Sequence, residues 1–322
     1  MSISSEPFLR SLPDIPDILL KLQSGVYTLH GGVVRHAAGT SQGGQIVGHL
    51  LFPGDAFQTQ QSIQSLQTAL SNGIGSLEGG IAHLQQSMNV LQGLQTANLV
   101  ISGLNLAVSA AGFVVVCKKL NEISSQIHAQ SQGILQTLQL VGEVYDRSLL
   151  LDEARFRSLL LSSQQFCEQG NKKALNVLIP QFHQEYQFTK LILEKHALIA
   201  ASNIDCFSEI ALLQDRLLNL GLMMSHVQLI ADAPKYAQEF LMELAKDIAT
   251  FNTRRIEALM SDRAVASRMS ATHLADLTAF LQNGSAMVHA LSYRADVIGL
   301  DTCYPGLLPK VLESKEILLV FA

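Results

Sequence analysis

The sequence predicts a mostly α-helical protein with a small N-terminal β-meander, a long central helix or helical hairpin, a C-terminal helical bundle and a short terminal strand. Three patterns predict this fold class. Glycine-separated β-branched runs occupy 26–52, apolar residues then recur every three or four positions to residue 145, and amphipathic helical patterns follow from about residue 170. We expect four regions, 1–55, 56–165, 166–300 and 301–322.

Composition places the chain among globular proteins. Its 322 residues are 48% hydrophobic and 15% charged with a net charge of −5, which excludes a disordered chain and argues against a nucleic-acid-coating protein. The four cysteines are too few and too scattered for a secreted disulfide scaffold, so we expect a reducing compartment. The first twenty residues carry acids and prolines, and we expect no signal peptide.

The N-terminal region predicts three strands behind an irregular or short helical lead. Pro13 and Pro16 interrupt residues 1–24, and glycines at 31–32 and 39–44 separate the β-branched runs. Three such strands leave unpaired edges and make a poor core alone. We therefore expect an oligomer in which the β units of several copies close on one another.

The central region combines a heptad pattern with a stretch long enough for a membrane. Apolar residues at heptad spacing predict a long packed helix over 56–96, whose outer positions are mainly uncharged. Residues 97–117 then run for 21 positions without a charge, which as a helix is about 31 Å, close to the hydrocarbon thickness of a bilayer. Lys118 and Lys119 follow and suggest a cytoplasmic membrane boundary. Apolar spacing resumes to Tyr145, so the helix either continues or folds back as a hairpin.

Polar and small residues inside 97–117 lie on one stripe of the predicted helix. At steps of four and three, these candidate pore-lining residues are Asn98, Ser102, Asn105, Ser109 and Gly112. Because isolated polar groups are costly in lipid, the stripe should face other helices or line an uncharged pore in a ring of copies. The alternative is a buried helix of a soluble bundle, where small residues allow close packing. If residues 97–117 insert into a membrane, two alternatives follow. Either the helix 58–96 enters the membrane with them as the second arm of a hairpin, or insertion is conditional.

The C-terminal half predicts an ordinary helical bundle and one last strand. We expect helices near 171–200, 204–231, 234–268 and 271–298, with Pro180 at a kink or an early break. The apolar tail from Ile317 to Ala322 is typical of a strand that pairs with the N-terminal meander.

Motifs of common enzymes are absent, and we expect a protein that is not an enzyme and needs no metal or cofactor. We interpret His30, His36 and His49 on the expected strands as half-exposed or interface residues rather than metal ligands. Basic residues on the bundle either hold an anionic ligand or are solvated helix faces. They are Lys172, Lys173, Lys190, Arg254 and Arg255, with Arg263 nearby.

A short set of segments resembles a known group of proteins. The segments that carry the resemblance are the meander with Tyr27-Thr-Leu-His-Gly-Gly-Val-Val and Gly44-Gln-Ile-Val-Gly-His-Leu50, the long helix that follows, and Asn105-Leu-Ala-Val-Ser-Ala-Ala-Gly-Phe113 with Lys-Lys-Leu120. The chain resembles membrane-channel effectors of bacterial antiphage defence, such as the Hailong effector. The resemblance covers about residues 25–145. It implies an oligomer such as a tetramer, joined through the N-terminal strands. It also implies a channel held shut by a nucleotide or oligonucleotide from a partner nucleotidyltransferase, and no ligand-binding residue carries over.

We therefore expect an oligomeric ion channel or pore that depolarises the infected cell, in abortive infection, from the bacterial inner membrane with its other domains in the cytoplasm. Its expected partners are further copies of itself, membrane lipid and the regulatory nucleotide. Two other classes remain open. One is a soluble helical interaction or scaffold protein whose apolar helix is a bundle core, and the other is a helical pore-forming toxin.

Overall fold

The computed structural model describes residues 9–11, 16–30, 32–51, 61, 64, 110–137, 143–307 and 317–321. These residues form two compact units. The sheet unit contains the N-terminal strands, the first helix and the described chain from Ser292 onward. The helix unit contains the described residues from Ala110 to Leu291. The described residues 110–165 and 166–291 thus share one unit, whereas residues 292–300 of the expected bundle region and the tail belong to the sheet unit.

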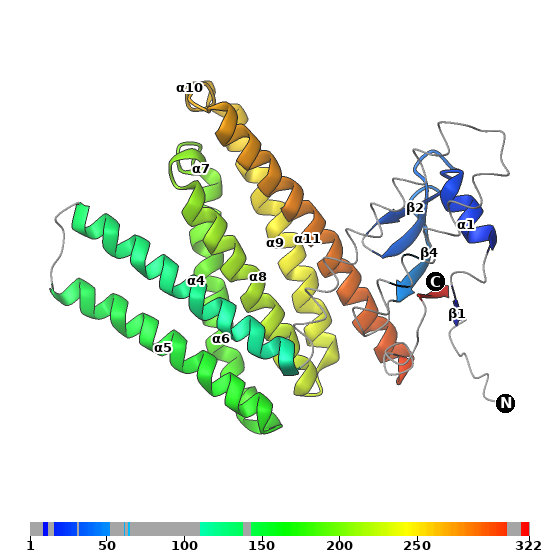
Figure 1. Ribbon diagram of the computed structural model, residues 1–322, viewed down its shortest axis with the longest axis horizontal. Coiled ribbons are helices and arrows are strands. Elements are labelled where there is room, and N and C mark those ends of the chain that lie inside the picture. The colour runs from blue at the N-terminus through cyan, green and yellow to red at the C-terminus, as the bar shows by residue number, and fades with distance from the viewer. Residues whose placement is uncertain are drawn as a thin grey trace. The chain divides into compact units, whose positions relative to one another are not determined.

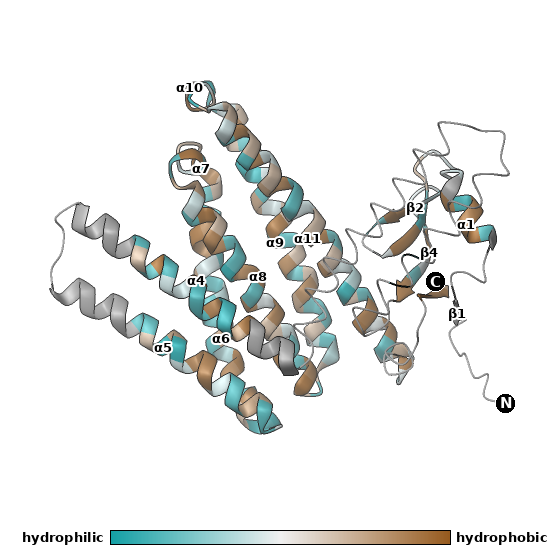
Figure 2. Ribbon diagram, viewed as in Figure 1, coloured by the Kyte–Doolittle hydropathy of each residue, from teal (hydrophilic) through white to brown (hydrophobic). Residues whose placement is uncertain are grey.

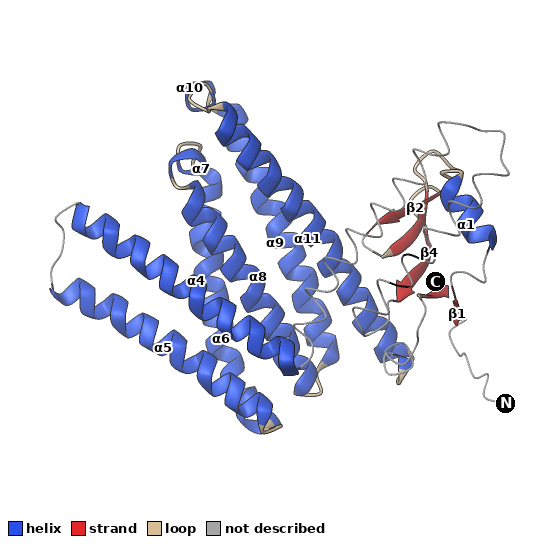
Figure 3. Ribbon diagram, in the orientation of Figure 1, coloured by secondary structure: helices blue, strands red, loops and turns tan. Residues whose placement is uncertain are grey.

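The sheet unit is built on a five-stranded antiparallel sheet with the order β1-β5-β4-β3-β2 (Figure 3). Strands β2 (Tyr27–His30), β3 (Val33–His36) and β4 (Ile46–Leu51) form the predicted meander. The C-terminal strand β5 (Leu318–Phe321) pairs with β4, opposing His49 to Val320, and with β1 (Leu9–Ser11) on its other side. The expected pairing of the tail with the meander is confirmed.

The sheet packs against α1 (Pro16–Gln23) and the last turns of α11 (Ala271–Cys303), and successive strand residues such as Val33 and Val34 are both buried. Their contact residues form one apolar core that includes Leu22 from α1, Leu50 from β4 and Tyr293 from α11. The Tyr293 hydroxyl also donates a hydrogen bond to the Leu50 carbonyl oxygen, so a buried polar group is satisfied where helix and strand meet. The short helical lead predicted before residue 24 is therefore α1, which begins at Pro16.

The helix unit consists of long helices packed side by side (Figure 1). Its elements are α4 (Ala110–Thr137), α5 (Glu143–Glu168), α6 (Lys172–Leu198), α7 (Ser202–Asp205), α8 (Phe207–Ile230), α9 (Pro234–Ser261), α10 (Arg263–Ala266) and the first part of α11. Helix α4 continues beyond the apolar stretch to Thr137 and α5 then packs back against it, so the continuation and the fold-back considered for this region both occur.

Local sequence signals explain where several helices begin. The Asn171 side chain caps α6 by accepting from the Ala174 amide at 3.1 Å, and Asp262 caps α10 by accepting from the Val265 amide at 3.0 Å. Helix α9 begins at Pro234, whose missing amide hydrogen is not needed in a first turn. Pro180 lies inside α6, and the helix continues past it to Leu198, so the early break considered for this position does not occur.

Helix α8 is the centre of the bundle. It packs against α4, α6 and α9, and its residues from Asn219 to Gln228 are buried without interruption. A helix covered on all sides is expected to be largely apolar, and α8 is so apart from buried polar residues such as Ser225 and His226. Gly221 permits the approach of α9, because a Cβ atom there would lie 2.4 Å from a Leu244 methyl carbon.

Within the described part of the chain, every helix is either too short or too polar to cross a bilayer. Figure 2 shows hydrophilic and hydrophobic residues mixed along the helices. The expected membrane segment 97–117 is described only from Ala110 onward, and its residues 97–109 lie outside the described residues. The expected helix 56–96 lies outside them as well, apart from Gln61 and Gln64.

Candidate functional site

The predicted pore stripe falls mostly outside the described residues. Asn98, Ser102, Asn105 and Ser109 are not described, and Gly112 lies in the first turn of α4. The structure therefore does not test whether these residues lie on one stripe of a helix.

The C-terminal end of the apolar stretch is packed into the helix unit. Val116 is 7% exposed and Cys117 is 4% exposed, and Leu120 and Ile123 continue the buried side of α4. The Cys117 thiol lies 3.9 Å from the Leu160 carbonyl oxygen of α5.

The two lysines predicted to mark a membrane boundary are both exposed on α4. The Lys119 ammonium lies 2.9 Å from an Asp215 carboxylate oxygen on α8. An exposed pair of this kind contributes about 0–1 kcal/mol to stability. Its main effect is to fix which side of α4 faces α8 immediately after the apolar stretch.

Further along the hairpin, α4 and α5 are joined by a second charged cluster. His128 lies 3.3 Å from the Glu153 carboxylate, which also pairs with Arg157 one turn later. Arg157 in turn donates to the Ser125 hydroxyl at 3.1 Å. The end of the apolar stretch and the helix that follows it are thus held to the bundle by apolar and polar contacts together.

Most of the predicted anion-binding cations already have carboxylate partners. Lys172 lies 2.5 Å from Asp232, Lys190 lies 2.7 Å from Asp247, and Arg254 pairs with Glu194. Lys173 is exposed on the first turn of α6.

These cations do not form one site. Lys172 is in the first turn of α6, whereas Glu194, the partner of Arg254, is near its last turn, about 33 Å away along the helix axis. The cations therefore divide into a group at the start of α6 and a group at its end.

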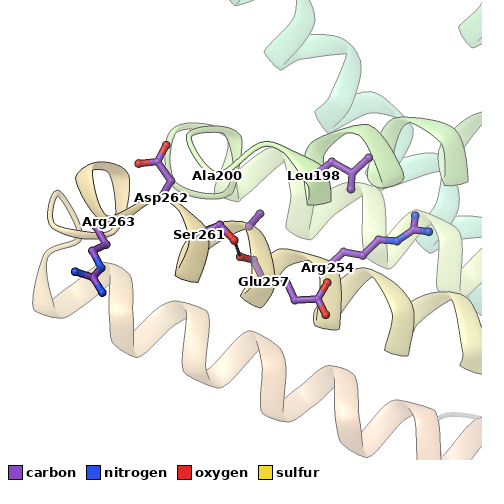
Figure 4. Close-up of a pocket in the computed structure, with 8 residues that line it drawn as sticks. Leu198, Ala200, Arg254, Glu257, Ser261, Asp262 and Arg263 are labelled. Carbon is purple, nitrogen blue, oxygen red and sulfur yellow. Dashed lines mark hydrogen bonds between the residues drawn. The ribbon is translucent and has the colours of Figure 1, made fainter.

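The second group borders a pocket of about 500 Å³ at the tip of the helix unit (Figure 4). Its lining residues come from the end of α6, the end of α9, the loops that follow them and the start of α10. They are Leu198, Ala200, Arg254, Glu257, Ala258, Ser261, Asp262 and Arg263. Two cationic and two anionic side chains make the lining polar with no net charge. Such a pocket can bind a polar ligand, and it presents no nucleophile paired with a base.

Arg255, next to Arg254 in the chain, is fully buried beside this pocket. Its Nε donates to the Asn203 amide oxygen at 2.8 Å, Nη1 donates to the Asn252 amide oxygen at 3.1 Å, and the guanidinium lies 4.8 Å from the centre of the Phe280 ring. The Nη2 atom has no hydrogen-bond partner among the described residues. Burial without a carboxylate lowers the pKa of Arg255 to about 10.

This arginine cluster was not predicted from the sequence as a unit. Neither Asn203 nor Phe280 stands in a sequence pattern that points to Arg255. The contacts join three segments that lie far apart in the chain, and such contacts leave no local pattern. The arginine pair itself was the one visible signal.

The histidines of the sheet lie in different surroundings. His36 packs edge-on against Tyr27, with ring centres 4.9 Å apart, whereas His49 is buried and lies 3.4 Å from Asp296 of α11. His30 is at the exposed end of β2. The described residues contain no cluster of three or more side chains suited to hold a metal ion.

Comparison with known proteins does not assign the chain to a family. No protein-family model, curated protein or solved structure matches the chain significantly.

Proposed function

We propose that this protein is an oligomeric membrane ion channel or pore that acts as an effector of bacterial antiphage defence. It acts by assembly and ion conduction rather than by catalysis. Its membrane element is the uncharged stretch 97–117 at the bacterial inner membrane, and its other parts lie in the cytoplasm.

The observation that supports the proposal best is the length of the uncharged stretch, 21 residues, whose last residues begin helix α4 of the bundle. Val116 and Cys117 belong to the stretch by sequence and are buried in the bundle by structure. The Lys119–Asp215 pair follows within one turn. A rearrangement of α4 against α5 and α8 would therefore act directly on the conducting segment, as gating requires.

A nucleotide or oligonucleotide signal, from a partner nucleotidyltransferase, would keep the channel closed until infection. The pocket at the tip of the helix unit is the place we propose for such a ligand, because Arg254 and Arg263 both line it. Glu257 and Asp262 also line it, so binding of an anion would require these carboxylates to turn away or to bind a bridging cation.

A second candidate function is a soluble helical interaction or scaffold protein. The burial of Val116 and Cys117 favours it, because a helix that continues this packing toward residue 97 would be a bundle core. The two candidates differ in whether the protein partitions into membranes.

Flotation of the full chain with liposomes, followed by single-channel recording, tests the proposal. We expect the protein to float with the lipid, and Asn105→Leu or Ser109→Leu to change the conductance without changing assembly, since both would replace a polar side chain on the predicted pore stripe. A protein that stays in the aqueous fraction would favour the soluble candidate and contradict the channel.

A further inference from the structure

We draw no further inference here: the strongest candidate, the pair formed in the helix unit by the Cys167 thiol of α5 and the His226 imidazole of α8, 3.6 Å apart, carries none, because burial raises the pKa of the thiol and nothing in the described part of the chain shows what the pair would bind or react with.

Discussion

Arg254 and Arg255 are neighbours in the chain with opposite surroundings. The sequence indicated one basic pair for an anionic ligand, but successive side chains of a helix point about 100° apart. Arg254 consequently borders the pocket and pairs with Glu194, whereas Arg255 points inward to Asn203 and Asn252. Two adjacent arginines on a helix therefore do not predict one common binding site unless it is known which side of the helix is buried.

At the scale of elements, the contact of β3 with α11 depends on Gly32. This residue has φ of +93°, and a Cβ atom there would lie 2.7 Å from the Tyr293 ring. Tyr293 cannot move aside freely, because it is buried and its hydroxyl is bonded to Leu50. Gly32→Ala should therefore loosen the sheet unit by roughly 1–3 kcal/mol.

Hydrogen exchange measures this loosening at the Leu50 amide, which donates to the Gly32 carbonyl at 2.8 Å. We expect at least tenfold faster exchange in Gly32→Ala. Gly39→Ala is the control, since Gly39 has no atom within 4 Å of its would-be Cβ. Gly44→Ala, with φ of +83° but open space, separates backbone strain from the steric clash. Unchanged exchange in Gly32→Ala would contradict the packing of Tyr293.

The elements with strong periodicity were the ones predictable from sequence. Glycine-bounded β-branched runs indicated β2 to β4, and the apolar tail indicated β5. Helical spacing indicated α6 and α8 to within a few residues, whereas α9 ends at Ser261 rather than near residue 268 and α11 continues to Cys303. Short elements were missed for a physical reason. Strand β1 has three residues and no alternation to detect, and it is defined only by its pairing with β5, more than 300 residues away. The four-residue helices α7 and α10 are likewise too short to show a period; Asp262 caps α10, and α7 has no side-chain cap.

At the scale of the whole molecule, ion pairs and hydrogen bonds between residues far apart in the sequence could not be predicted. Lys119 was interpreted as a membrane boundary from its position after an apolar stretch, and its bond to Asp215, 96 residues later, had no sequence signal. The same holds for the link between Arg255 and Asn203. Sequence patterns report the period of an element and its apolar side, whereas the choice of partner depends on the tertiary fold.

The channel proposal rests on residues 97–117, and ion leak from liposomes tests it most directly. Purified full chain is added to liposomes loaded with a fluorescent ion reporter, together with Ala110→Asp, which places a charge in the apolar stretch and should abolish insertion. Ala271→Asp, the same substitution at an exposed position of α11, is the matched control. The account predicts leak from wild type and Ala271→Asp, and none from Ala110→Asp. Leak that is equal in wild type and Ala110→Asp, or absent from wild type after removal of bound nucleotide, would contradict it.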